Sequence, residues 1–204
     1  MKERPIIFNA EMIRAILDGR KTQTRRVLKK QPLEILPMKV PNEWIGLMSR
    51  EPNRGVVFKS KYGVPGDRLW VKETHWINQD EHLVCYRADN EMPEHVRACG
   101  EHWRPSIHMP RWASRILLEI TDNRVERARD ITIRDLIAEG AWDLPEDWDS
   151  GEALDYTAEG CSDPRPWSAW SRLWDSINAK RGYGLGVNPW VWVIAFKSVK
   201  GGAQ

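Results

Sequence analysis

The chain has 204 residues, of which 41% are hydrophobic and 29% charged, and its formal net charge at pH 7 is +2. This length and balance predict one elaborated domain that folds without disulfides, and they argue against wholesale disorder. There is no apolar run of about 20 residues and no signal-peptide core, and the three cysteines form no CxxC pair, so we expect a cytoplasmic protein without a membrane partner.

The first predicted elements are a short strand and an amphipathic helix. Residues 5–8 are apolar and indicate a strand, and Asn9 can then cap a helix with an apolar stripe over residues 12–17. Gly19 stands where a helix end favours a left-handed residue. Residues 20–28 are polar and basic without a clean period, so the pattern assigns them no element.

The rest of the chain is predicted to hold several strands and two further helices. Apolar runs and alternations indicate strands at residues 56–59, 68–73, 83–88, 114–127 and 190–196. Thr132 and Asp135 form a capping box that opens a short helix ending near Gly140. Pro166 can begin a helix that ends near Gly182. The last strand is apolar on both faces, which predicts a central place in a sheet.

This order of elements predicts the fold class. Many short strands and three helices indicate an α+β fold, mostly β, built as a small and partly closed β-barrel with peripheral helices. The sequence has no GxGxxG or Walker loop that would favour a doubly wound nucleotide-binding fold.

Tryptophan content and charge placement are the two unusual features of the composition. Twelve tryptophans stand against three phenylalanines, and indole rings suit stacking on bases as well as filling a core. Residues 20–30 carry six bases and no acid, whereas residues 143–163 carry eight acids and no base. Such runs are typical of solvated surfaces, and a basic stretch beside a glycine turn is also typical of a phosphate contact.

The strongest local signal lies in residues 19–26, GRKTQTRR, directly after the first predicted helix. Lys21 and the hydroxyl of Thr24 could form a base and nucleophile, because neighbouring arginines favour the neutral amine that accepts a proton. Residues three apart share a face of a helical turn but point to opposite faces of a strand. From spacing alone, a solvated basic loop and a catalytic pair both stay open.

Four segments together resemble the ASCH domain family, and the last of them is similar to its phage and prophage branch. They are residues 16–26 (ILDGRKTQTRR), the Gly66-Asp67 turn before a strand, residues 191–197 (VWVIAFK) and residues 104–113 (RPSIHMPRWA). The resemblance implies a PUA-like β-barrel. It implies a single domain over residues 1–204, with long insertions near 30–62, 77–103 and 143–165.

The resemblance also implies an activity and the residues that carry it. Small bacterial members of the family are amidohydrolases that remove the acetyl group from N4-acetylcytidine with a lysine, a threonine and a glutamate. The matching positions are Lys21, Thr24 and Glu139, the last at the end of the predicted helix after Thr132. On this basis Thr24 attacks the acetamide carbonyl, Lys21 accepts its proton, and Glu139 acts as acid toward the departing amine, with no cofactor and no metal.

Six further residues are predicted to bind the substrate. Arg20 and Arg26 flank the motif, and Glu73 ends the strand that carries Trp70, where an acid and an aromatic ring could read a base edge. Arg111 and Trp112 offer a cation and an indole side by side. The alternatives are an exposed carboxylate at a strand end for Glu73 and a packed ring beside a surface cation for Trp112. The predicted binding set is Arg20, Arg26, Trp70, Glu73, Arg111 and Trp112.

A zinc site is a competing interpretation of the histidines and cysteines between residues 75 and 108. His82 and Cys85, followed by Cys99 and His102, have the ligand types of a structural zinc site. Against this, residues 83–88 are predicted to be a strand, where side chains three apart point to opposite faces. We therefore predict no metal.

The sequence thus predicts an amidohydrolase that binds a modified nucleoside or a single-stranded nucleic acid. The alternatives are a non-catalytic RNA- or DNA-binding module and a nuclease that uses the same basic cleft. A neutral Lys21 beside Thr24 would distinguish the enzyme from the binding module, which needs charged lysines instead.

Overall fold

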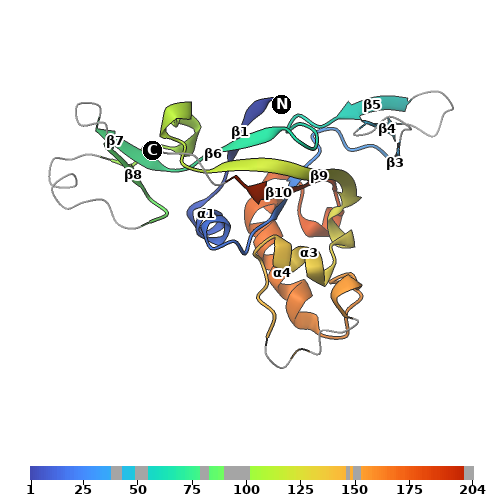
Figure 1. The fold of residues 1–204 in the computed structure, drawn as a ribbon. Coiled ribbons are helices and arrows are strands. Elements are labelled where there is room, and N and C mark those ends of the chain that lie inside the picture. The colour runs from blue at the N-terminus through green and yellow to red at the C-terminus, as the bar shows by residue number, and fades with distance from the viewer. Residues whose placement is uncertain are drawn as a thin grey trace.

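A computed structural model shows an α+β fold in which strands predominate (Figure 1). It describes residues 1–37, 43–48, 55–78, 83–89, 102–145, 148 and 153–199. Within those ranges no helix has both the length and the apolar character needed to cross a membrane.

The centre of the fold is a five-stranded sheet with the order β1-β6-β9-β10-β2. Its strands are β1 (Glu3–Ile7), β2 (Gln23–Val27), β6 (Arg68–Lys72), β9 (Leu117–Arg127) and β10 (Trp190–Ser198). β1 runs parallel to β6, and the other pairs are antiparallel. β9 has one extra residue, Thr121, opposite the step between Ala195 and Phe196, which forms a β-bulge.

β10 lies between two neighbours, which confirms its predicted central place. Its side chains alternate between two cores. Trp192, Ile194 and Phe196 pack into one cluster with residues of β1, β6 and α1 (Ala10–Leu17). Val191 and Val193 pack into the other, beneath α3 (Ile133–Ala138) and α4 (Pro164–Asn178). A strand buried on both faces has no polar face, which explains its continuous apolar run.

The three helices begin where the sequence provides caps. The Asn9 side chain accepts a hydrogen bond from Met12 N at the start of α1, and Gly19, with φ +76°, follows its end. The Thr132 side chain accepts from Asp135 N at the start of α3. α4 is capped by Asp163 and begins two residues before the predicted Pro166.

β2 corrects the sequence interpretation, which assigned no element to residues 20–28. β2 is polar along its length because its side chains meet charged partners. Gln23 Nε2 and Arg25 Nη2 both donate to the carboxylate of Asp135, at 3.1 and 2.7 Å. The hydrophobic alternation that marks most strands is therefore missing, although β2 pairs regularly with β10.

Two small sheets extend the fold at either end of the central strands (Figure 1). One is formed by β3 (Glu34–Pro37), β4 (Glu43–Leu47) and β5 (Gly55–Lys59), so the segment 30–62 contains a sheet of its own. The other is the hairpin of β7 (His75–Asn78) and β8 (Leu83–Tyr86).

The described strands do not close into a barrel, which corrects the barrel expected from the sequence. β1 and β2 are the two edges of the central sheet and share no backbone ladder. The edges nevertheless face each other, because Arg26 Nη2 on β2 donates to Ile7 O on β1 at 2.6 Å. Side chains and a cavity, in place of strand pairing, occupy the gap between them.

Candidate active site

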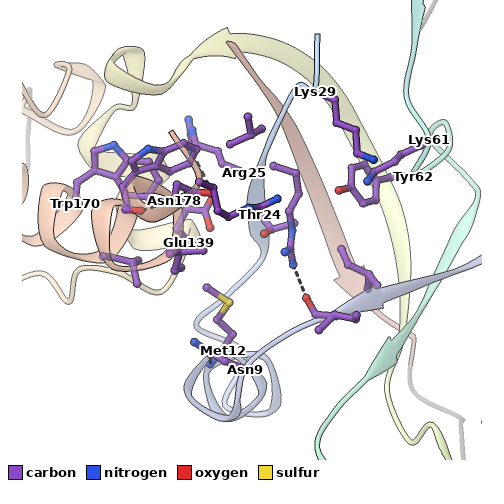
Figure 2. A pocket seen from close by; sticks show the side chains of 18 of the residues that line it. Asn9, Met12, Thr24, Arg25, Lys29, Lys61, Tyr62, Glu139, Trp170 and Asn178 are labelled. Carbon is purple, nitrogen blue, oxygen red and sulfur yellow. Dashed lines mark hydrogen bonds and ion pairs between the residues drawn. The ribbon is translucent and has the colours of Figure 1, made fainter. Parts of the chain in front are cut away.

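A cavity of about 540 Å³ opens between the two edges of the central sheet (Figure 2). β1, the start of α1, β2, the end of α3 and one face of α4 contribute to its wall. The lining residues are Pro5, Ile6, Ile7, Asn9, Met12, Thr24, Arg25, Arg26, Val27, Lys29, Lys61, Tyr62, Glu139, Trp170, Leu173, Trp174, Ile177, Asn178 and Arg181. Its size lies within the range of small-molecule sites.

A buried ion pair joins Lys21 to Glu139 at the wall of this cavity. Lys21 Nζ lies 2.6 Å from Glu139 Oε2 and donates a second hydrogen bond to Glu139 O at 2.8 Å. The Lys21 side chain is 0% exposed and that of Glu139 is 4% exposed. Burial lowers the pKa of Lys21, although the carboxylate of Glu139 opposes this shift. The amine can therefore lose its proton more readily than a surface lysine.

The backbone around Gly140 allows this close approach. Glu139 is the last residue of the α3 turn, and Gly140 follows it with φ +66°. A side-chain carbon at Gly140 would lie 3.3 Å from Lys21 Cβ and 3.2 Å from Ala15 Cβ. Lys21 N also donates to Ala15 O at 2.9 Å. The end of α3 and the segment after α1 are thus packed directly against each other.

Thr24 lies on β2, opposite Ile194 of β10. It is buried, lines the cavity and makes no side-chain hydrogen bond to any residue that the structure describes. Lys21 precedes β2 in the chain, so the alternation of a strand does not separate the two side chains. The Thr24 hydroxyl is free to meet a ligand in the cavity.

Arg25 is held rigidly beside the ion pair. Its side chain is 1% exposed, and Nη2 contacts Asp135 at 2.7 Å and Glu126 at 3.0 Å. Burial alone would raise the pKa of Asp135, but Arg25 and Arg124 hold that pKa below its ordinary value. Nη1 lies 3.6 Å from Glu139 Oε1, a separation too long for a hydrogen bond.

Unsatisfied polar atoms concentrate at this cavity. Nine buried side-chain nitrogen or oxygen atoms of the described residues have no hydrogen-bond partner, and four of them belong to lining residues. These four are Arg25 Nε, Arg25 Nη1, Arg26 Nε and Glu139 Oε1. Because buried polar groups are nearly always paired, this wall is suited to a polar ligand that supplies both donors and acceptors.

We compared the chain with family models, curated proteins and solved structures. None matches. The resemblance to the ASCH family therefore stays a prediction from the sequence. The function is inferred below from the side chains of the cavity.

The structure brings four of the predicted site residues together. Thr24, Arg26 and Glu139 line the cavity, and Lys21 is bonded to Glu139. The Arg26 guanidinium lies over the ring of Phe8 at 5.0 Å while it donates to Ile7 O. Lys21 thus pairs with Glu139 although the two are 118 positions apart, and Thr24 lines the same cavity as Glu139.

The other predicted binding residues lie away from the cavity lining. Arg20 is exposed and forms ion pairs with Asp18 at 3.0 Å and Asp143 at 3.8 Å. Trp70 has two cations over its ring, Lys72 at 5.4 Å and Arg111 at 5.9 Å.

Trp112 and Glu73 also lie outside the cavity lining, and their side chains differ in exposure. Trp112 is 61% exposed. Glu73 is buried, and both its carboxylate oxygens accept hydrogen bonds from Arg115 at 3.0 Å. Burial raises the pKa of Glu73, and Arg115 partly offsets that rise.

Sequence reasoning did not assign several lining residues to the site. Trp170 and Trp174 belong to an i, i+4 stripe of α4, which also predicts a helix packed on the core. Both rings pack into the core and also line the cavity, with their centroids 5.2 Å apart and their planes tilted by 46°. Lys61 and Tyr62 lie in a turn and Arg181 in a short 3-10 helix, and none of the three belongs to a sequence motif.

The described residues hold no group of three or more histidine, cysteine, aspartate or glutamate side chains able to bind a metal ion. His82 and Cys99 of the competing zinc hypothesis lie outside the described residues. Cys85 is free and half-buried.

Proposed function

We propose that this protein is an amidohydrolase that removes an acyl group from N4-acylated cytidine, with Thr24 as nucleophile. The observation that carries the proposal is the buried Lys21–Glu139 pair, 2.6 Å apart, on the wall that also presents the free Thr24 hydroxyl. A hydroxyl, an amine of lowered pKa and a carboxyl group in one closed site are the components of nucleophilic acyl transfer.

The first half of the reaction transfers the acyl group to Thr24. The reaction begins when one proton passes within the ion pair from Lys21 Nζ to Glu139 Oε2, which leaves a neutral amine and a protonated carboxyl group. Thr24 Oγ attacks the amide carbonyl carbon and its proton passes to Lys21. The carbon–nitrogen bond then breaks as Glu139 gives its proton to the departing cytosine amine. The products are acyl-Thr24, a charged Lys21 and an ionised Glu139.

The second half returns the site to its starting state. Water attacks the acyl-Thr24 carbonyl and loses a proton to Glu139. The ester bond breaks as Lys21 returns its proton to Thr24 Oγ, and the carboxylic acid leaves. Lys21 and Glu139 thus end the cycle with the same protons that they had at its start. A close amine–carboxyl pair is suited to such reversible proton transfer.

The remaining wall supplies binding and charge stabilisation. Arg25 Nη1 is a buried donor without a hydrogen bond, suited to the negative charge that develops on the carbonyl oxygen. Trp170, Trp174 and Tyr62 offer aromatic faces on which a base can stack.

The same proposal extends to the fold. The central sheet is open, and its two edges face each other across the cavity. This arrangement fits a PUA-like barrel of the ASCH type that is open between β1 and β2. The partner is then a modified nucleoside or a single strand whose base enters at this gap.

Release of cytidine from N4-acetylcytidine tests the activity directly. Thr24→Val keeps the shape of the side chain and removes the hydroxyl, so turnover should fall by about three orders of magnitude or more. Thr22→Val is the matched control, because Thr22 is exposed and lies two positions away. Mass spectrometry of the intact chain should detect an acylated form of the unsubstituted protein and of Thr22→Val, and none of Thr24→Val. Turnover by Thr24→Val equal to that of Thr22→Val would contradict the proposal.

A non-catalytic nucleic-acid-binding module is the second candidate. It is favoured by the excess of cations in the lining, where Glu139 is the one acidic residue among five basic ones. Binding of cytidine ligands with no release of product from any N4-acylated cytidine would select this candidate.

A further inference from the structure

Three exposed cations of the cavity lining have no acidic partner among the residues that the structure describes. Lys29 follows β2, Lys61 follows β5, and Arg181 ends the short helix η5 (Ala179–Arg181) after α4. All three are exposed and line the cavity, and none forms a salt bridge with a described residue.

The other two cations of the lining are already engaged. Arg25 contacts Asp135 and Glu126, and Arg26 donates to Ile7 O. The single acid, Glu139, is paired with Lys21. The exposed positive charge of the cavity lining is therefore carried by Lys29, Lys61 and Arg181, because Arg26 is half-buried.

The layout separates this charge from the reacting groups. In Figure 2, Lys29, Lys61 and Tyr62 lie on one side of Thr24, whereas Trp170, Asn178 and Glu139 lie on the other. Lys61 Nζ lies 4.9 Å from the centre of the Tyr62 ring, so the aromatic face borders the cations. A ligand whose amide meets Thr24 would extend a second, anionic end toward the lysines.

We propose that Lys29, Lys61 and Arg181 form a phosphate-binding subsite, so that the substrate is a phosphorylated cytidine and not the free nucleoside. The identity of the base rests on the proposed function, whereas the phosphate subsite rests on the charges alone. Lysine and arginine at a cavity mouth are the side chains that neutralise phosphate, either as a terminal group or within a strand.

Calorimetric titration of the whole chain with cytidine and with cytidine 5′-monophosphate tests the subsite without any hydrolysis. The monophosphate should bind at least about tenfold more tightly at low salt, which corresponds to about 1.4 kcal/mol. Its advantage should shrink as salt is added, because the contacts are electrostatic. Equal affinities for the two ligands would overturn the proposal.

Adjacent residues of the same charge provide matched controls. Lys29→Ala and Arg181→Ala should each reduce the preference for the monophosphate several-fold and leave cytidine binding unchanged. Lys30→Ala and Lys180→Ala remove the same charge one position away, from side chains that do not line the cavity. If the control variants lost as much of the preference for the monophosphate as the cavity variants, the preference would come from general electrostatic attraction. That result would overturn the proposed subsite.

Two further measurements identify the source of the phosphate and separate the phosphate subsite from the proposed amidohydrolase activity. A short oligocytidylate that binds more tightly than the monophosphate, with the same dependence on Lys29, assigns the subsite to a strand; equal binding assigns it to a mononucleotide. Thr24→Val should keep the phosphate preference. Phosphate preference without hydrolysis would reject the amidohydrolase and retain the subsite, and hydrolysis without phosphate preference would do the reverse.

Discussion

Lys21 and Glu139 form an ion pair that is closed off from solvent on both sides. A buried pair of this kind is costly to break, because removal of one partner leaves the other charge without compensation. The pair also lies between two segments, the end of α1 and the end of α3, that are distant in the chain. Its energetic contribution and its chemical role can therefore be separated by mutation.

A double-mutant cycle should show this coupling. Lys21→Met and Glu139→Leu should each lower the free energy of unfolding by about 3–5 kcal/mol, because each leaves a buried group unpaired. The double variant should lose clearly less than the sum. Chemical denaturation of the four proteins measures the coupling. Additive losses would mean that the two side chains do not interact in solution.

His75 provides a pH-dependent prediction at a second buried residue. Its ring is fully buried, with Nδ1 3.0 Å from Glu73 O and no hydrogen-bond partner for Nε2 among the described residues. Burial holds the pKa of His75 below the ordinary value of about 6.5. The unfolded chain therefore takes up a proton below about pH 6.5 before the folded chain does.

The sign of the effect follows from proton uptake. Because the unfolded state binds more protons in this window, the free energy of unfolding should fall as pH decreases below about 6.5, by at most about 1.4 kcal/mol per pH unit. Denaturation curves between pH 7 and pH 5 measure the slope. His75→Gln should flatten it. An equal slope in the two proteins would assign the pH dependence to other groups.

The family resemblance grouped three residues from two distant segments, and the structure shows part of that grouping. Lys21 is hydrogen-bonded to Glu139, and Thr24 and Glu139 line the same cavity. Their catalytic roles stay predictions. The role of Arg25 was not visible, because its partners Asp135 and Glu126 lie about a hundred positions away. Spacing along a chain carries no information on such contacts.

At the scale of elements, the ends of α1 and α3 decide how the ion pair is assembled. Both helices end before a glycine with positive φ, Gly19 at +76° and Gly140 at +66°. Only Gly140 has close neighbours, since a side-chain carbon there would contact Lys21 and Ala15, whereas Gly19 has open space around it. The two glycines thus share a backbone requirement and differ in packing.

Alanine at the two glycines should separate these effects. Gly19→Ala should lower the free energy of unfolding by about 1–2 kcal/mol, the cost of a left-handed residue with a side chain. Gly140→Ala should cost more, and it should also reduce turnover, because Lys21 must shift to make room. Thermal unfolding and N4-acetylcytidine hydrolysis measure the two quantities. Equal stability losses and unchanged turnover would contradict a packing role for Gly140.

Elements with a clear period were predicted well and those with polar contacts were not. Asn9 and Thr132 cap α1 and α3 as expected, since a cap is a local interaction. β2 was missed because its polar side chains find partners on α3 and β9. The open sheet was also missed, because no local pattern tells whether the first and last strands of a sheet meet.

At the scale of the whole molecule, the cavity connects the two hydrophobic cores. Ile6 of its wall belongs to the core beneath β1 and α1, and Trp170 and Trp174 belong to the core beneath α3 and α4. A ligand that contacts both walls binds the folded state alone, because the unfolded chain has no such site. Binding should therefore stabilise the entire chain.

Thermal unfolding with cytidine 5′-monophosphate measures this stabilisation. At a ligand concentration about 100 times the dissociation constant, the free energy of unfolding should rise by about 2.7 kcal/mol, which raises Tm by about 5–10 °C for a chain of this size. Lys29→Ala should need more ligand for the same shift, and Lys30→Ala should not. A Tm that does not change when the nucleotide is added would contradict binding at this cavity.

The way the two edges of the central sheet face each other has a consequence for self-association. Edge strands with free N–H and C=O groups are templates on which other chains add strands and aggregate. Here β1 and β2 turn those edges toward each other, and the Arg26 guanidinium already occupies the carbonyl of Ile7. A neighbouring molecule would therefore meet side chains at these two edges, where strand pairing needs free backbone groups. The largest sheet among the described residues should therefore resist growth into an intermolecular one along these two edges.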